Sequence, residues 1–352
     1  MNKEEISGLE PAKRTTRTKQ RRRQAAGKTV PEPKGVMKAA AIDRFGPPSV
    51  LKLHELPMPE PGPREVLIAL HASGVGVWDA DIRGGWWPGK RPKFPLVLGT
   101  DGAGIVAVKG ARVRSFGVGD RVWAYEFLNP KCGFYAEYVA VNAGHVGRVP
   151  RRLDLLHAGA ATVTGLTALQ GIDDHLRVRR GETVLIFGAS GAVGTLAVQF
   201  AKRRGARVLG TATGSKATQL VRQLGASGVI DARKPRGIEQ LPELAPDGID
   251  AVLALVGGEA LERCLDLVRP GGRVAYPNGV EPEPKRRQEF RLQSYDAAGG
   301  RREFTNLARA VDEARLRVPI AAVYPLAQAA KAHERVERGQ VAGRIALRIR
   351  QG

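Results

Sequence analysis

Short apolar runs separated by polar turns dominate the first part of the chain. They are rich in β-branched residues and bounded by Gly and Pro clusters, which is typical of strands joined by turns. The runs expected to be strands are residues 37–42, 51–56, 65–73, 97–109, 121–125 and 134–141. A longer apolar stretch over residues 155–172 favours a helix. The pattern therefore predicts a mainly β region followed by a change of architecture.

A regular alternation of strand and helix patterns follows. The expected strands are residues 184–187, 207–211, 227–231, 249–256 and 272–276, and the expected helices between or beside them are 193–201, 216–224 and 259–268. Parallel strands with crossover helices form a doubly wound α/β sheet. Helix patterns over residues 302–315 and 326–338 precede a last strand, 344–349. That strand has no βα partner, so we expect it to return to the first domain.

The turn after residues 184–187 is rich in glycine and opens a helix. Ala189, Gly191 and Gly194 stand where the G-x-G-x-x-G fingerprint places its small residues. A Cβ at Gly191 would block the approach of a phosphate to the backbone, and a Cβ at Gly194 would push the helix off the strand. A strand, turn and helix of this kind holds a dinucleotide pyrophosphate at the helix N-terminus. The alternative is a glycine-rich turn that binds nothing.

The end of the next strand indicates which dinucleotide binds. NAD sites usually place an Asp or Glu there, to accept a hydrogen bond from the ribose 2′-hydroxyl. Residues 210–216 contain no acid; they include Thr213 and end in Ser215 and Lys216. A hydroxyl and an ammonium suit a 2′-phosphate, so the stretch favours NADPH. The alternative is that Lys216 is only solvated in the first turn of the following helix.

Positive charge is concentrated at the N-terminus of the chain. The formal net charge of the 352 residues is +21, and residues 1–34 supply +6 of it, from ten Lys or Arg minus four Glu. Residues 1–35 are almost free of large apolar side chains, so we expect a disordered basic tail, with contact to nucleic acid through that tail left open. The remaining charge is spread thinly and would help to gather an anionic cofactor.

The cysteines, the histidines and the hydropathy of the chain restrict which kinds of protein it can be. Cys132 and Cys264 are the only cysteines, which excludes a disulfide framework and indicates a reducing cytoplasm. The six histidines form no pair at metal-ligand spacing. No apolar run approaches the roughly 18 residues of a membrane span. We therefore expect a cytoplasmic protein with no metal and no membrane partner.

Several short motifs together resemble the medium-chain dehydrogenase/reductase superfamily, and within it the zinc-free quinone oxidoreductase group. The matching stretches are residues 72–79, 98–104, 119–122, 134–138, 165–168, 189–194 and 269–273, and the closing Gly343-Arg344. The resemblance covers about residues 37–350. It implies a GroES-like catalytic domain over residues 37–157 and 298–352, interrupted by a Rossmann domain over residues 158–297, with an active-site cleft between them and usually a homodimer.

The resemblance also bears on metal and reaction. Zinc-dependent relatives have a cysteine at the position of Gly76 in this chain. They have Gly-His-Glu at the position of residues 99–101, where this chain has Gly-Thr-Asp. Their second zinc needs four clustered cysteines, and near that lobe this chain offers only Cys132. We therefore expect no zinc. The zinc-free relatives instead transfer a hydride from NADPH to a quinone or α,β-unsaturated carbonyl, for which positioning and oxyanion stabilisation suffice.

Site residues follow position by position. The resemblance implies that Thr167 lies near the nicotinamide. The alternative is that its hydroxyl only donates to a backbone carbonyl of the preceding helical turn. Tyr125 and Tyr135, with Asp79 or Asp101, are the candidates for proton donation, and delivery from water is the alternative. Trp86 and Trp87, with Trp78, form a candidate aromatic wall for a flat substrate, against ordinary packing. The residues expected to bind the cofactor are Ala189, Ser190, Gly191, Ala192, Val193, Gly194, Thr213, Ser215, Lys216, Arg233, Asn278, Gly279 and Arg344.

Two other functions remain open at this point. One is a carbonyl or enoyl-thioester reductase of the same superfamily, for which a long acyl channel or a phosphopantetheine-binding patch is expected. The chain departs from the zinc-free group at two polar positions, which are replaced by Gly76 and within Gly85-Trp86-Trp87. The other is a cofactor-binding protein that uses the basic tail to hold RNA or DNA. The acceptor itself is not determined by these patterns.

Overall fold

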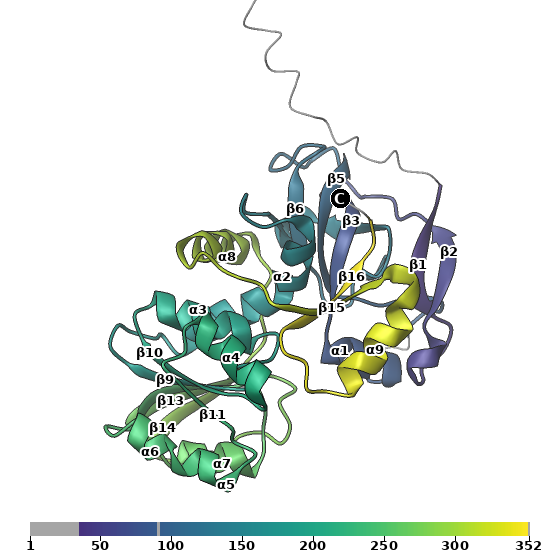
Figure 1. The fold of residues 1–352 in the computed structure, drawn as a ribbon. Coiled ribbons are helices and arrows are strands. Elements are labelled where there is room, and N and C mark those ends of the chain that lie inside the picture. The colour runs from purple at the N-terminus through teal and green to yellow at the C-terminus, as the bar shows by residue number, and fades with distance from the viewer. Residues whose placement is uncertain (1–34, 90–91, 351–352) are drawn as a thin grey trace, which may run out of the picture.

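The computed structural model describes residues 35–89 and 92–350, so the basic tail lies outside the described residues. Figure 1 shows two parts, a β-rich part and a doubly wound sheet covered by helices on both faces. The chain enters the β-rich part first, passes through the doubly wound sheet and returns to the β-rich part with its last two strands, β15 and β16. The expected α/β fold class is confirmed.

The β-rich part contains two sheets. A small sheet has the order β2-β1-β4, and a larger sheet has the order β15-β16-β3-β5-β6-β8, with β7 paired to β3. Their bounds are β1 Val36–Ile42, β2 Lys52–Pro57, β3 Glu65–Val75, β4 Leu96–Val97, β5 Asp101–Lys109, β6 Arg121–Tyr125, β7 Tyr138–Asn142, β8 Val146–Arg148, β15 Ile320–Pro325 and β16 Arg344–Arg348. Every residue of β3 after Glu65 is buried, which explains its near-continuous apolar sequence.

The doubly wound sheet is parallel and has the order β11-β10-β9-β12-β13-β14. Its strands are β9 Thr183–Phe187, β10 Arg207–Thr211, β11 Gly228–Ile230, β12 Ile249–Ala254, β13 Val268–Pro277 and β14 Phe290–Tyr295. The chain adds strands outward from β9 to β11 and then restarts at β12 on the other side of β9. This reversal is the topological switch point at which such sheets bind ligands, at the carboxyl ends of the strands.

Helices complete both parts. Figure 1 shows α3 and α4 on one face of the doubly wound sheet and α5, α6 and α7 on the other. The bounds are α1 Val77–Gly84, α2 Leu155–Gln170, α3 Gly194–Arg203, α4 Ser215–Leu224, α5 Pro235–Glu239, α6 Leu241–Leu244, α7 Glu259–Leu265, α8 Arg301–Glu313 and α9 Ala329–Glu337. In the part of the chain that the structure describes, no helix is long and apolar enough to cross a membrane.

The structure corrects several expected elements. The strand predicted over residues 97–109 is broken, because Gly99 adopts a φ of +91° between β4 and β5. Residues 269–271 lie between the expected helix 259–268 and the expected strand 272–276, whereas β13 runs through them with Gly271 at a φ of +80°. The pattern also missed α1, β14 and β15. The return of the last strand is confirmed, since β16 pairs antiparallel with β3.

Candidate functional site

The glycine-rich turn lies at the switch point, between the end of β9 and the start of α3. A Cβ on Gly194 would stand 2.2 Å from the Gly188 carbonyl oxygen, so the close contact of helix and turn requires glycine there. A Cβ on Gly191 would meet only that same oxygen, at an ordinary 3.4 Å. The packing of the chain itself therefore explains Gly194 but does not explain Gly191.

The end of β10 carries the expected 2′-phosphate residues together with an acid that sequence reasoning did not consider. Ser215 and Lys216 are exposed in the first turn of α4. The Thr213 hydroxyl, however, donates to Asp231 Oδ1 at 3.5 Å. Asp231 follows β11, the parallel neighbour of β10, and its position at the carboxyl end of a predicted strand was the signal that could have revealed it. The site is therefore less basic than residues 210–216 alone indicate.

The other cofactor candidates lie on neighbouring strand ends. The backbone N–H of Arg233 donates to Asp231 Oδ1 at 3.2 Å, and its side chain is exposed. Asn278 follows β13, where its side-chain amide donates to Asp296 Oδ2 at 2.8 Å. Gly279 comes next, with a φ of +89°. The structure thus places Thr213, Arg233 and Asn278 after β10, β11 and β13, at the edge of the sheet that the turn also occupies.

The C-terminal strand ties this turn to the β-rich part. The Gly343 N–H donates to the Ser190 carbonyl oxygen at 2.9 Å, and Gly343 also forms a bridge with Gly191. Arg344 begins β16 and is 3% exposed. Its Nη2 lies 3.2 Å from Asp101 Oδ1, an ion pair buried on both sides. Arg344 therefore sits where the two parts meet, and its charge is already paired within the protein.

Trp78 packs beside Arg344 and fills the space next to Gly76. The Arg344 guanidinium lies 5.2 Å from the centroid of the indole ring, and the indole N–H donates to Thr100 Oγ1 at 2.9 Å. A Cβ on Gly76 would stand 2.5 Å from the ring. Glycine at this position is therefore a packing requirement of Trp78, and the half-buried indole occupies the region where the resemblance expected polar side chains.

A chain of buried polar side chains runs from α1 to α9. Arg83 Nη1 lies 3.1 Å from His333 Nδ1, His333 Nε2 lies 3.3 Å from the Tyr135 hydroxyl, and that hydroxyl donates to Asp79 Oδ2 at 3.0 Å. Because guanidinium only donates, His333 accepts at Nδ1 and donates from Nε2. Sequence reasoning missed His333 and Arg83, since a lone histidine in a helix pattern carries no signal of its partners.

Burial shifts the pKa values along this chain in opposite directions. Burial raises the pKa of Asp79 to about 7, against the opposing effects of the Gly76 N–H and the Arg344 charge. Burial, reinforced by the Arg83 charge, lowers the pKa of His333 to about 3. The hydroxyl of Tyr135 has a pKa well above its usual value because of burial and the nearby Asp79. Tyr135 is fully buried, and its hydroxyl proton is already donated to Asp79.

The remaining catalytic candidates are largely engaged in packing. Thr167 is 8% exposed on α2 and its hydroxyl donates to the Val163 carbonyl oxygen at 2.9 Å, which is the backward bond named as the alternative. Tyr125 ends β6 opposite Asp101, and burial raises the pKa of its hydroxyl to about 12. Trp86 is 56% exposed and its ring contacts that of Phe127, whereas Trp87 packs against an apolar cluster of the β-rich part. The three tryptophans do not share one packing environment.

The residues at the site do not fit a metal ion. Over residues 35–89 and 92–350, no three His, Cys, Asp or Glu side chains come together in a way that could hold one. Cys132 and Cys264 are both buried, and burial raises the pKa of each thiol to about 12, away from the thiolate that a metal needs.

Known proteins resemble the chain in both parts. The family model described as alcohol dehydrogenase GroES-like domain matches residues 62–151, and the one described as zinc-binding dehydrogenase matches residues 224–347. The quinone oxidoreductase of Sus scrofa is 34% identical over 311 residues, which cover 85% of this chain and 93% of that protein.

Two solved structures extend the comparison. An NAD-dependent alcohol dehydrogenase has a TM-score of 0.83 at 30% identity, with 89% of this chain and 100% of that chain covered. The Escherichia coli quinone oxidoreductase in complex with NADPH has a TM-score of 0.79 at 26% identity, with the same coverage. These relatives agree in fold and differ in the cofactor that their names give.

Proposed function

We propose a function for this chain from its family: it belongs to the medium-chain dehydrogenase/reductase superfamily and to its quinone oxidoreductase-like group. The proposed function is an NADPH-dependent reductase of quinones or α,β-unsaturated carbonyls that works without zinc. The observation that carries the proposal is the turn at the switch point, held by Gly343 next to the buried Arg344 and Trp78. It brings a dinucleotide site and an aromatic surface together where the two parts of the fold meet.

The turn would bind the cofactor through its backbone. Residues 191–193 lead into the N-terminus of α3, where peptide N–H groups and the helix dipole favour a pyrophosphate. Ser215 and Lys216 would bind the 2′-phosphate from the first turn of α4. The nicotinamide would extend past Asn278 and Gly279 toward Thr167. When bound, the reduced nicotinamide supplies a hydride.

The β-rich part would hold the acceptor. Trp78 offers an aromatic plane whose position is fixed by Thr100 and Arg344, so a flat acceptor can stack without reordering the wall. Tyr135 is committed to Asp79, and the hydroxyl of Tyr125 is difficult to ionise. We therefore assign the proton of the reduced acceptor to water. Since the described residues do not fit a metal ion, no step is assigned to zinc.

Fluorescence titration with NADPH and NADH, followed by a panel of quinones, enals and enones, tests this function. We expect tighter binding of NADPH and its oxidation with at least one acceptor. If NADPH binds but no acceptor in the panel consumes it, the reductase proposal is wrong while the cofactor assignment stands. The variant Lys216→Ala should raise the Kd for NADPH roughly tenfold and leave the Kd for NADH unchanged, because only NADPH carries the phosphate.

NADH is a second candidate cofactor, and Asp231 is the observation that favours it. Its carboxylate stands beside Thr213, close to where a ribose 2′-hydroxyl would need an acceptor and where a 2′-phosphate would be repelled. Replacing Asp231 with Asn distinguishes the candidates. NADPH affinity should rise in this variant if the 2′-phosphate lies near Asp231, whereas a loss of NADH affinity would assign the acid to the ribose.

We also propose a homodimer, as the resemblance implies. β14 is the edge strand of the doubly wound sheet and pairs only with β13 in the described chain. Such an edge can pair with the same strand of a second copy. Light scattering coupled to size exclusion gives the mass, and a monomer at micromolar concentration contradicts the proposal.

A further inference from the structure

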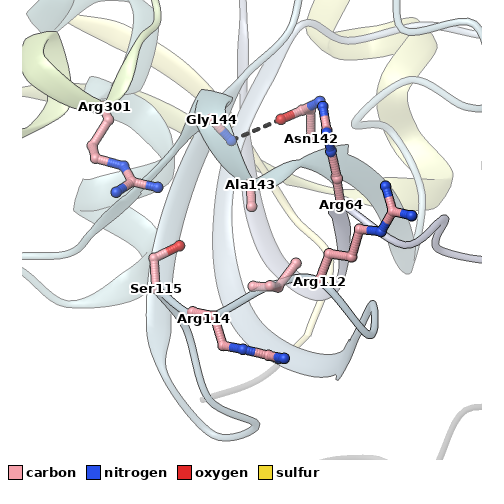
Figure 2. A pocket seen from close by; sticks show the side chains of 9 residues that line it. Arg64, Arg112, Arg114, Ser115, Asn142, Ala143, Gly144 and Arg301 are labelled. Atoms are coloured by element: carbon pink, nitrogen blue, oxygen red, sulfur yellow. Dashed lines mark hydrogen bonds between the residues drawn. The ribbon is translucent and has the colours of Figure 1, made fainter.

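A hollow near the N-terminal end of β3 and the start of α8 is lined by four arginines. It has a volume of about 540 Å³ and lies among Arg64, Arg112, Val113, Arg114, Ser115, Asn142, Ala143, Gly144 and Arg301. Figure 2 shows Arg301 on one side of the hollow and Arg64 and Arg112 on the other. A volume of this size is in the range of small-molecule sites, which is roughly 300 to 1,000 Å³.

The polar side chains around the hollow can donate hydrogen bonds, and no acidic residue is among those that line it. None of the four arginines forms an ion pair within residues 35–89 and 92–350, although the nearby Arg148 is paired with Asp120 at 2.7 Å. Asn142 Oδ1 already accepts from the Gly144 N–H at 2.8 Å, which leaves the side-chain NH₂ group of Asn142 as a donor. Guanidinium groups match the oxygens of phosphate in pairs, so a bound phosphate would relieve the mutual repulsion of these charges.

The backbone of the lining loops is fixed before any ligand binds. The Arg112 N–H donates to the Pro63 carbonyl oxygen at 2.8 Å, and the Ala143 N–H donates to the Arg64 carbonyl oxygen at 3.0 Å. Three loops that are distant in sequence are thereby held side by side. A preformed site loses less conformational entropy on binding than a mobile one.

Helix α8 supplies the fourth arginine through a specific packing contact. Phe304 is 1% exposed and lies against Gly147 of β8, where a Cβ would come within 2.5 Å of the phenylalanine side chain. Its ring is 6.0 Å from that of Trp123. Arg301 lies one turn earlier on the same face of the helix, so the docking of Phe304 sets its position at the hollow.

The hollow is separate from the proposed acceptor surface at Trp78. Arg64 precedes β3 and Gly76 follows it, and an 11-residue strand places its two ends roughly 30 Å apart. The lining contains no aromatic side chain on which a base could stack, which argues against a strand of nucleic acid. We propose that this hollow is a binding site for a small phosphate-bearing anion, held by Arg64, Arg112 and Arg301; Arg114 already donates from Nη1 to the Ala111 carbonyl oxygen at 2.8 Å and adds positive charge to the lining.

Calorimetric titration of the full chain with inorganic pyrophosphate, at low and at moderate salt, tests the site. We expect saturable binding that weakens with salt, because the arginines are exposed. The double variant Arg112→Gln/Arg301→Gln should weaken it roughly tenfold or more. The matched control is Arg302→Gln/Arg309→Gln, which removes the same total charge from the protein, at two exposed residues of α8 that do not line the hollow. All variants carry the same basic tail and phosphate turn.

Three outcomes would overturn the proposal. The first is that pyrophosphate does not bind saturably, and the second is that both double variants lose affinity for it equally. The third is that the first double variant binds pyrophosphate like the parent and loses affinity only for a single-stranded oligonucleotide or for vesicles of anionic lipid. The melting temperature serves as the folding control, and it should stay unchanged because the substituted side chains are exposed. If the first double variant melts early, single replacements of Arg112 and Arg301 replace it in the comparison.

Discussion

Asp79 and His333 are buried ionisable residues in one hydrogen-bonded chain, and their protonation affects stability with opposite signs. The pKa of Asp79 is raised to about 7, so between pH 4 and 7 the folded protein holds a proton that the unfolded chain has lost. Its contribution to stability therefore falls as the pH rises through that window. The pKa of His333 is lowered to about 3, so between pH 3 and 6.5 only the unfolded chain is protonated, and this contribution rises with pH.

Two variants should separate these effects. The unfolding free energy of Asp79→Asn relative to the parent protein should increase from pH 4 to 7, by as much as a few kcal/mol, because the parent loses a contribution that the variant lacks. That of His333→Gln relative to the parent should decrease from pH 3.5 to 6.5. Urea unfolding at half-unit pH steps measures both. Parallel profiles for the parent and either variant would contradict the assigned shift.

The contact between Gly76 and Trp78 gives a second prediction at the scale of residues. Gly76→Ala should destabilise the protein by about 1 to 3 kcal/mol, because the methyl group overlaps the indole at 2.5 Å. It should also change tryptophan emission by breaking the bond to Thr100. Gly84→Ala is the matched control at the end of the same helix, where a Cβ meets nothing within 4 Å. If both variants unfold at the same urea concentration as the parent, the close packing of Gly76 is wrong.

At the scale of elements, the two glycines of the turn serve different purposes. Gly194 is needed for α3 to reach the turn, because its Cβ would enter the backbone at Gly188. Gly191 faces no such obstacle from the chain. Both glycines belong to one sequence fingerprint. The packing of the helix against the turn shows that the fold itself requires glycine at position 194, whereas at position 191 only a ligand would require it.

Replacing each glycine with alanine tests this division. Gly194→Ala should lower stability by about 1 to 3 kcal/mol and weaken cofactor binding as a consequence. Gly191→Ala should keep the melting temperature of the parent and raise the Kd for NADPH roughly tenfold or more, because the methyl group stands where the pyrophosphate approaches. Thermal melting with fluorescence titration checks both. An unchanged Kd in Gly191→Ala would show that the phosphates do not cross this turn.

At the scale of the whole molecule, the pair of Arg344 and Asp101 joins the last strand to the interior of the β-rich part, beside the turn of the doubly wound sheet. Asp101 is fully buried, and its Oδ2 also accepts from the Val163 N–H at 3.0 Å. Burial raises the pKa of Asp101, and the Arg344 charge opposes that rise. Removing the guanidinium would leave a buried carboxylate without its counter-charge.

Arg344→Ala should therefore destabilise the protein by about 3 to 5 kcal/mol. Adding Asp101→Asn should recover part of the loss, because the neutral amide oxygen can still accept from Val163 while the unpaired charge disappears. Chemical unfolding of the parent, both single variants and the double variant gives the coupling between the residues. A double variant as unstable as the sum of its parts would contradict the ion-pair account.

The sequence by itself determined the elements whose signal is local. The strand, glycine turn and helix over residues 184–201 were read from periodicity, because apolar spacing and glycine placement depend on near neighbours. The return of residues 344–349 to the first domain was inferred because that strand has no βα partner. The boundary between the expected helix 259–268 and strand 272–276 was less accurate: β13 already begins at Val268, and its pairing with β12 shifts register between Val268 and Arg273.

Only the tertiary structure decided which side chains meet. It placed Asp231 beside Thr213, fitted Trp78 into the space left by Gly76, and linked Asp79 to His333 through Tyr135. It also gathered Arg64, Arg112 and Arg301 around one hollow. These contacts join residues far apart in the chain, and their geometry follows from how strands and helices pack rather than from any spacing along the sequence.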